Sequence, residues 1–175
     1  SQIGLFLAAF VAGGAAAQYP AGWLADKFDR RWVLIWLSVV SVLSCAVTVA
    51  ASGLGTAGVM ASAAFFGFTT FPVYSVAASH AHDFATSEER VELSAALMFF
   101  YASGAIAAPW LTSLLIENFG PSALFYFISG GHILLVIFGL SRMRVRETRE
   151  DRTPYVYAPR TSFTIGRLLG RSRDR

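Results

Sequence analysis

Five apolar stretches of nearly membrane-spanning length constrain this chain more than any other feature of its sequence. They cover residues 3–19, 32–51, 57–78, 93–116 and 123–141. A bilayer-spanning helix needs about 20 mostly apolar residues, and backbone groups in lipid must be hydrogen-bonded within their own segment. Only 14% of the 175 residues are charged, against roughly 25% in a soluble domain. The sequence therefore predicts an all-α membrane protein with five transmembrane helices.

The chain's 14 Lys and Arg residues fall on one side of this arrangement. They lie in the first connection (18–31), at Arg90 in the third, and after the last stretch. The second and fourth connections, 52–56 and 117–122, contain none. Because Lys and Arg in short loops stay on the cytoplasmic side, we expect the amino end outside and the tail, 142–175, inside.

The tail differs in composition from the rest of the chain. It is rich in Arg and has no long apolar run, which predicts disorder. A short amphipathic helix that rests Ile165, Leu168 and Leu169 on the anionic leaflet is the alternative. The placement of Lys and Arg on one membrane side is enough to explain the basic charge of the chain, so we expect no nucleic-acid partner. Because the chain begins Ser-Gln with no basic leader, we also expect a piece of a longer chain.

The five stretches are of two kinds. Stretches 32–51 and 123–141 are bulky, with many branched or aromatic side chains, which suits lipid contact. Stretch 3–19 carries small residues at four-residue spacing, which let helix backbones approach closely. Stretches 57–78 and 93–116 mix small, polar and helix-bending residues. We therefore expect these three to face the protein interior and the bulky pair to form the rim; simple packing of the small residues remains the alternative.

The third connection contains a helix-start signal. Thr86 and Glu89 have capping-box spacing ahead of an apolar run. Glu88, Glu89 and Glu92 would then lie where the helix dipole favours anions. This structural role is sufficient to explain these acids.

The first connection, QYPAGWLADKFDRR, is a densely charged turn between two apolar stretches. A turn with this charge cannot lie in hydrocarbon, so it marks one membrane surface. Gly22 permits close backbone approach, and Asp26 can accept hydrogen bonds from the start of a neighbouring helix. Arg30 and Arg31 can pair with acids. The candidate residues of this segment are Gly22, Leu24, Asp26, Lys27, Asp29, Arg30 and Arg31.

The decapeptide GWLADKFDRR (22–31) resembles the loop signature G-x-L-a-D-r-x-g-r-r of the major facilitator superfamily, with Asp29 where glycine is usual. The lead-in QYPAG and the later runs FPVYS (71–75) and HAHD (80–83) resemble the bacterial YcaD-like branch of that family, in which they lie in the carboxy-terminal half. The resemblance implies that the five stretches are helices eight to twelve, part of a six-helix half of the fold.

A transport function is what this resemblance implies. The chain would be a fragment of a secondary active transmembrane transporter that moves a small solute by alternating access. The charged segment would be a latch loop that holds the two halves together at the cytoplasmic side. The implied partners are a small-molecule solute, with proton coupling left open, the lipid bilayer, and the missing amino-terminal half of the same transporter. No cofactor is expected.

Five further residues are candidates for this function. Gln18, Tyr74 and Tyr101 combine hydrogen-bonding capacity with a place on the interior stretches, so they are candidate contacts along the solute pathway. Tyr is also common at membrane interfaces, and that explanation is equally open. Pro72 and Pro109 are expected to bend their helices, which suits a rocking transporter.

Ionisable chemistry within the apolar stretches is sparse. They contain no Asp, Glu, Lys or Arg, and His132 is expected to be a packed histidine. His80, His82 and Asp83 are poorly spaced for a shared metal, and a single Cys45 excludes an internal disulfide. We predict no catalytic residue, no metal site and no enzyme activity. A non-catalytic helical subunit of a membrane complex is the alternative to a transporter.

Overall fold

The computed structural model describes residues 2–145, which form five long helices. The helices are α1 (Gln2–Lys27), α2 (Arg30–Ala50), α3 (Gly55–His82), α4 (Arg90–Phe119) and α5 (Ala123–Val145), with a short 3₁₀ helix, η1, at Ala51–Gly53. All five long helices have the length and apolar composition needed to cross a membrane. The expected all-α, five-span fold is thereby confirmed.

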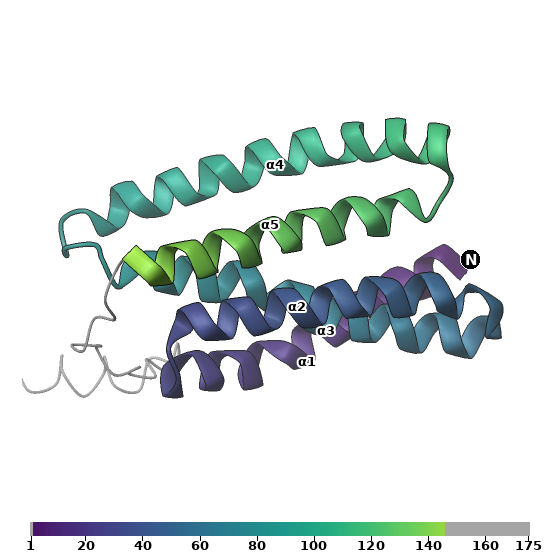
Figure 1. Ribbon diagram of the computed structural model, residues 1–175, viewed down its shortest axis with the longest axis horizontal. Helices are drawn as coiled ribbons and strands as arrows, with labels where there is room; N and C mark the ends of the chain where they lie inside the picture. The colour runs from purple at the N-terminus through teal and green to yellow at the C-terminus, as the bar shows by residue number, and fades with distance from the viewer. Residues whose placement is uncertain (1, 146–175) are drawn as a thin grey trace, which may run out of the picture.

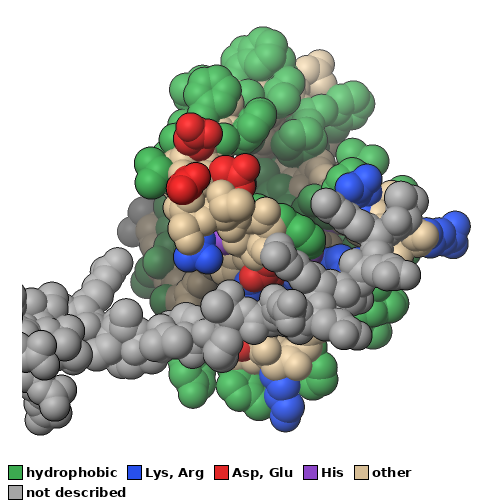
Figure 2. All heavy atoms as spheres, turned by 90° about the vertical axis from the view of Figure 1, so that its left-hand side faces the viewer, with side chains coloured by type: hydrophobic (Ala, Val, Ile, Leu, Met, Phe, Trp, Pro, Cys, Tyr) green, Lys and Arg blue, Asp and Glu red, His purple; other side chains and the backbone are tan. Residues whose placement is uncertain are grey.

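Successive helices run in opposite directions, so the connections alternate between the two ends of the bundle (Figure 1). The α1–α2 turn, the α3–α4 connection and the last turn of α5 share one end, here called the charged end. Its basic residues are Lys27, Arg30, Arg31, Arg90, Arg142 and Arg144. Figure 2 views this end directly and shows acidic and basic side chains there, with hydrophobic side chains flanking them. Among residues 2–145, the predicted one-sided placement of Lys and Arg is therefore present in the fold.

Glycine allows an unusually close approach of α1 and α3. A Cβ atom on Gly13 would lie 1.9 Å from the Ala64 carbonyl oxygen, and one on Gly67 would lie 1.9 Å from the Phe10 carbonyl oxygen. Any larger residue at either position would force the helices apart. The Phe10 ring also lies 5.1 Å from Phe66, centroid to centroid. The small-residue stripe of the first span serves the close packing expected of it.

A polar face of α2 packs against α3 and α5, which corrects the simple expectation of a lipid-facing helix. Its buried residues include Ser38, Ser41, Ser44, Cys45 and Thr48. Their spacing of three or four residues places them on one side of the helix. The large average side-chain size of α2 gave no sign of this polar face in the sequence, because exposed large residues alternate with the buried serines along the helix. Only the remaining surface of α2 is free for lipid.

Hydrogen bonds tie this polar face to α3. The Ser44 and Thr69 hydroxyl oxygens are 2.9 Å apart, and the Thr48 hydroxyl donates to the Ser62 carbonyl oxygen of α3 at 3.4 Å. The Ser44, Thr48 and Thr69 hydroxyls thereby find partners without water, which matters in a membrane interior because an unpaired polar group there is costly. These bonds fix the packing of α2 on α3.

The longest helix, α4, is also the least covered. It has 30 residues, and none of them is buried by the described part of the chain. It lies beside α5 at one side of the molecule (Figure 1). α3 and α4 continue through Pro72 and Pro109 without interruption, so the expected bends at these prolines stay a prediction.

The first connection is shorter than predicted. α1 continues to Lys27 and α2 begins at Arg30, so only Phe28 and Asp29 separate them. The prediction of a turn over residues 18–31 was wrong because it equated the end of apolar sequence with the end of the helix. Membrane helices tolerate Pro and Gly, and the charged last turns of α1 extend the helix beyond its apolar part. Gly22, Asp26 and Lys27 of the latch loop are therefore helical.

The last helix also exceeds its predicted boundary. α5 continues to Val145, so residues 142–145 are helical and do not belong to an irregular tail. Arg142 and Arg144 lie in its last turn, where the helix dipole favours cations. The predicted disorder, and the alternative amphipathic helix, concern residues that otherwise lie outside the described part of the chain.

Candidate functional site

The centre of the charged end is Arg30, which connects three helices. From the start of α2, its Nη1 donates to the Asp83 carboxylate at 2.6 Å and to the Ser79 carbonyl oxygen at 3.0 Å. Its Nη2 donates to the Asp26 carboxylate at 3.1 Å. The guanidinium is mostly buried, with 14% of its side chain exposed. Arg30 therefore bridges the last turn of α1 to the end of α3.

Two acids share the Arg30 guanidinium. Asp26 and Asp83 contribute two carboxylates to one guanidinium. Hydrogen bonds between ionised groups are stronger than neutral ones, so both acids are held in place. Asp26 keeps 32% of its side chain exposed. The exposed Asp26 carboxylate can accept a further donor.

Asp29 has a different function from the other acids of the segment. It is the N-cap residue of α2 and accepts a hydrogen bond from the Arg31 backbone N–H at 3.0 Å. Its carboxylate also pairs with the Arg31 guanidinium at 2.9 Å. Asp is among the preferred N-cap residues because its side-chain oxygen satisfies an otherwise unpaired backbone N–H. The departure from the usual glycine thus has a structural explanation.

The other latch loop residues lie around this cluster. A Cβ on Gly22 would meet nothing within 4 Å, so the described residues do not explain why a glycine is there. Leu24 is 37% exposed. The Lys27 ammonium lies 4.8 Å from the Trp23 ring centroid, a cation–π geometry. Asp26 accepts from the Arg30 side chain, and its predicted hydrogen bond with the start of a neighbouring helix stays a prediction.

Asp83 is the functional candidate that sequence reasoning missed. We considered it only with His80 and His82 as a weak metal group, whereas its carboxylate binds Arg30. A signal was present, because the first and third connections share one membrane side. An acid at the start of the third connection is then a natural partner for an arginine of the first.

The predicted capping box is present before α4. The Glu89 carboxylate accepts from the Thr86 backbone N–H at 2.9 Å and from its hydroxyl at 3.0 Å. The Thr86 hydroxyl accepts from the Glu89 N–H at 3.3 Å. Hydrogen bonds from the Thr86 backbone and side chain lower the pKa of the Glu89 carboxyl below its usual value. This arrangement fixes the entry into α4.

Two contacts bring together the proposed solute-pathway residues. The Ser75 hydroxyl donates to the Gln18 side-chain oxygen at 3.1 Å, linking α3 to α1. The Tyr74 and Tyr101 rings lie 5.2 Å apart, linking α3 to α4. Both rings remain exposed, at 43% and 58%, so they are accessible to a ligand.

A groove of about 100 Å³ joins the Gln18 contact to the Arg30 cluster. It lies between α1 and α3, and its polar lining comes from Gln18, Ser75, Ser79, Asp26 and Arg30. Small residues on both helices leave this space open. Polar groups of α1, α2 and α3 therefore line the groove between Gln18 and the charged end.

The histidines do not form a metal site in the described part of the chain. Within residues 2–145 no three His, Cys, Asp or Glu residues cluster as metal ligands would. The His82 Nε2 lies 3.4 Å from the Ser94 hydroxyl, and His80 packs edge-on against the Phe84 ring. His132 is 9% exposed, which agrees with a packed histidine.

These features define a polytopic helical membrane protein with an ion-pair cluster that joins three helices at one membrane face. The sequence matches the Major Facilitator Superfamily over residues 1–173. The chain belongs to this superfamily of transporters.

Curated relatives agree with this assignment. The chain is 31% identical over 156 residues to an uncharacterized MFS-type transporter of Yersinia pestis, covering 89% of this chain and 38% of that protein. It is 29% identical over 159 residues to the uncharacterized MFS-type transporter YcaD of Escherichia fergusonii, covering 90% and 38%. The chain thus spans 38% of the length of these relatives. The YcaD-like resemblance is confirmed.

A solved structure supports the fold. The POT family transporter PepTSo superposes with a TM-score of 0.69 at 19% sequence identity, covering 93% of this chain and 32% of that one. At this identity the likeness concerns the fold alone. The five helices are arranged as in part of a transporter of this fold.

Proposed function

We propose that the chain is part of a secondary active transporter that moves a small solute by alternating access, and that the latch loop closes its charged end. The supporting observation is the Arg30 bridge, which joins α1, α2 and α3 through Asp26 and Asp83. While such a contact is formed, it holds the helix ends together. When it breaks, the helix ends can separate. Alternating access requires such a reversible contact.

The missing part of the transporter would complete this cluster. The Asp26 carboxylate of the Arg30 cluster keeps its negative charge partly exposed. A basic side chain or a helix N-terminus from the amino-terminal half would complement that charge. The large exposed surface of α4 would also be covered by the missing half. We infer that this piece acts only together with that half.

The solute would pass along the α1, α3 and α4 surface that carries Gln18, Tyr74 and Tyr101. Gln18 and Ser75 supply an amide and a hydroxyl, and the tyrosines supply rings and phenolic groups. Such a surface suits a small solute with both apolar and hydrogen-bonding parts. The five apolar stretches, 3–19, 32–51, 57–78, 93–116 and 123–141, contain no Asp or Glu, so coupling to protons would depend on groups elsewhere.

The latch proposal is tested in the full-length transporter reconstituted into vesicles. Asp26→Asn keeps the shape of the side chain but removes its charge, so transport should fall by about tenfold or more while membrane insertion and monodispersity stay normal. Glu88→Gln is the matched control, because it removes an exposed acid from the same end. Full transport by Asp26→Asn, or an equal loss in the control, would refute the latch.

The membrane orientation is tested by thiol labelling. The chain has a single cysteine, and Cys45 is buried. We propose that the charged end faces the cytoplasm of a bacterial inner membrane. An impermeant maleimide should then label Leu54→Cys in intact cells and Ser87→Cys only after permeabilisation. The reverse result would invert the topology.

Assay of the purified protein for hydrolysis of ester and peptide substrates checks the proposed lack of enzyme activity.

A further inference from the structure

A second cavity at the charged end is lined by Arg31 of the latch loop but not by Arg30, Asp26 or Asp83, nor by the candidate solute contacts Gln18, Tyr74 and Tyr101. It has a volume of about 360 Å³ and is enclosed by α2, α3 and α5. This is within the roughly 300–1,000 Å³ typical of ligand sites. Arg31 and Ser38 both line it, and seven residues of helix correspond to about 10 Å of depth. The cavity therefore extends from the membrane surface into the apolar layer.

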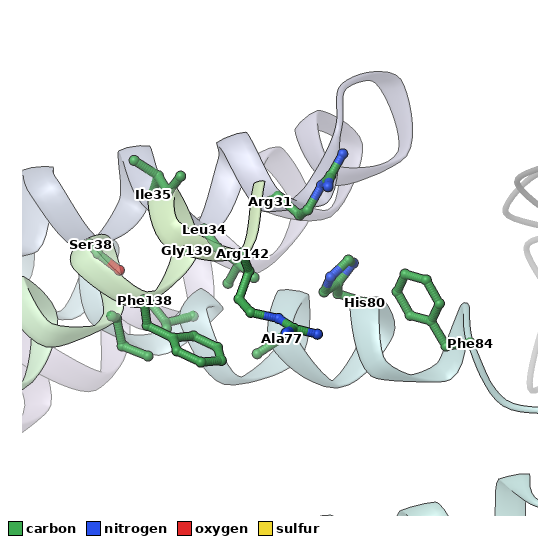
Figure 3. A pocket seen from close by; sticks show the side chains of 12 residues that line it. Arg31, Leu34, Ile35, Ser38, Ala77, His80, Phe84, Phe138, Gly139 and Arg142 are labelled. Carbon is green, nitrogen blue, oxygen red and sulfur yellow. The ribbon is translucent and has the colours of Figure 1, made fainter. Parts of the chain in front are cut away.

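The lining changes character with depth. At the surface it presents Arg31, His80 and Arg142, and further in it presents Val73, Leu135 and Phe138. Figure 3 shows the Arg142 side chain extending from α5 toward α3, where Ala77 and His80 lie. A ligand that fits this cavity has an anionic group at one end and an apolar chain at the other.

The positive charge at the mouth is carried chiefly by Arg142. Arg31 is paired with Asp29 at 2.9 Å, which reduces its net charge. Asp83, near His80, is bound to Arg30. Among the described residues no carboxylate lies within ion-pair distance of Arg142, which is exposed at the end of α5. Its guanidinium can therefore take an anion without first breaking a salt bridge.

We propose that this cavity binds an anionic phospholipid of the leaflet at the charged end. The phosphate would lie against Arg142, with Arg31 beside it, and one acyl chain would fill the apolar part between Val73, Leu135 and Phe138. A phospholipid matches both halves of the lining and is present at this depth in a bilayer. Basic pockets between transmembrane helices are recognised lipid headgroup sites. Because α2, α3 and α5 all contribute, the bound lipid stabilises their packing.

The test uses the full-length transporter in nanodiscs of equimolar phosphatidylglycerol and phosphatidylethanolamine. Native mass spectrometry counts the phosphatidylglycerol molecules retained after transfer to detergent. Arg142→Gln should weaken retention of one molecule by about tenfold, the effect of losing one charge-assisted contact. Ala77→Phe, which fills the cavity from α3 without changing charge, should also remove that molecule. Size-exclusion chromatography verifies that both variants are folded.

The matched control is Arg144→Gln. Arg144 lies in the same last turn of α5 but does not line the cavity. Equal loss of lipid in this variant would show diffuse attraction to the surface and would overturn the proposal. Full retention in Ala77→Phe would do the same, because the acyl chain would then lie elsewhere. Displacement of the lipid by inorganic phosphate alone would identify a free-anion site and would likewise contradict a lipid site.

Discussion

The Arg30 guanidinium and the Asp83 carboxylate lie 2.6 Å apart, although 53 residues separate them in the sequence. The contact joins the start of α2 to the residue that follows α3. Both side chains are largely shielded, with 14% and 22% exposed, so the pair is stronger than one on an open surface. It fixes how the charged end of the bundle closes.

Loss of this pair should destabilise the helix ends. In Asp83→Asn, Arg30 retains Asp26 and the Ser79 carbonyl but loses its shortest charged contact. We expect the free energy of unfolding in detergent to fall by about 1–2 kcal/mol. Thermal unfolding of the full-length protein measures this change. Glu88→Gln, an exposed acid nearby, should leave stability within about 0.5 kcal/mol of the parent; equal effects would mean that Asp83 has no specific role.

The N-cap role of Asp29 gives a second prediction. Asp29→Ala removes the acceptor for the Arg31 N–H and should cost about 1 kcal/mol, whereas Asp29→Asn should retain most of the stability. Asp29→Gly should cost only a few tenths more than Asn. Denaturant unfolding of the three variants ranks them. If Asn were as damaging as Ala, the ion pair with Arg31 would be the important interaction instead.

The close approach of α1 and α3 predicts a packing effect. Gly13→Ala places a Cβ where the Ala64 carbonyl oxygen now lies, so the helices must separate. Overpacking of this kind costs typically about 1–3 kcal/mol. Gly130→Ala is the control, since a Cβ on Gly130 meets nothing within 4 Å. A lower melting temperature for Gly13→Ala alone, measured in one detergent, is the expected outcome.

The capping box before α4 should respond to acid. Hydrogen bonds from Thr86 lower the folded-state pKa of Glu89, so the stabilisation is complete above the unfolded-state value of about 4.3. It is lost as the pH falls through the lower folded-state pKa. Hydrogen exchange of the 86–93 segment, corrected for intrinsic rates, should accelerate in that range. Glu89→Ala should remove the pH dependence, and Glu88→Ala should preserve it.

Sequence reasoning located the helices because membrane length and apolar composition are strong constraints. It also located the charged end, since Lys and Arg distribute by membrane side, and the Thr86–Glu89 capping box, which is a local motif. The predicted ends of the helices were less accurate. Hydropathy indicates where the apolar part of a helix ends, whereas α1 continues beyond its apolar part through Lys27.

The contacts across helices could not be predicted in the same way. The Arg30–Asp83 pair depends on the rotation of α3 relative to α2, which no local pattern specifies. The buried serines of α2 were overlooked because average bulk hides one polar face. The described part of the chain buries no residue of α4, so its interior role stays a prediction. The Gln18, Tyr74 and Tyr101 assignment likewise stays a proposal.

The unequal lengths of the helices have a mechanical consequence. α2 has 21 residues and α4 has 30, which correspond to about 31 Å and about 45 Å. A hydrocarbon layer of about 30 Å accommodates α2 almost upright, whereas α4 must tilt or protrude. A change in bilayer thickness would therefore act mainly on α4, and the lipid composition of the host membrane would bias the angle at which this helix stands.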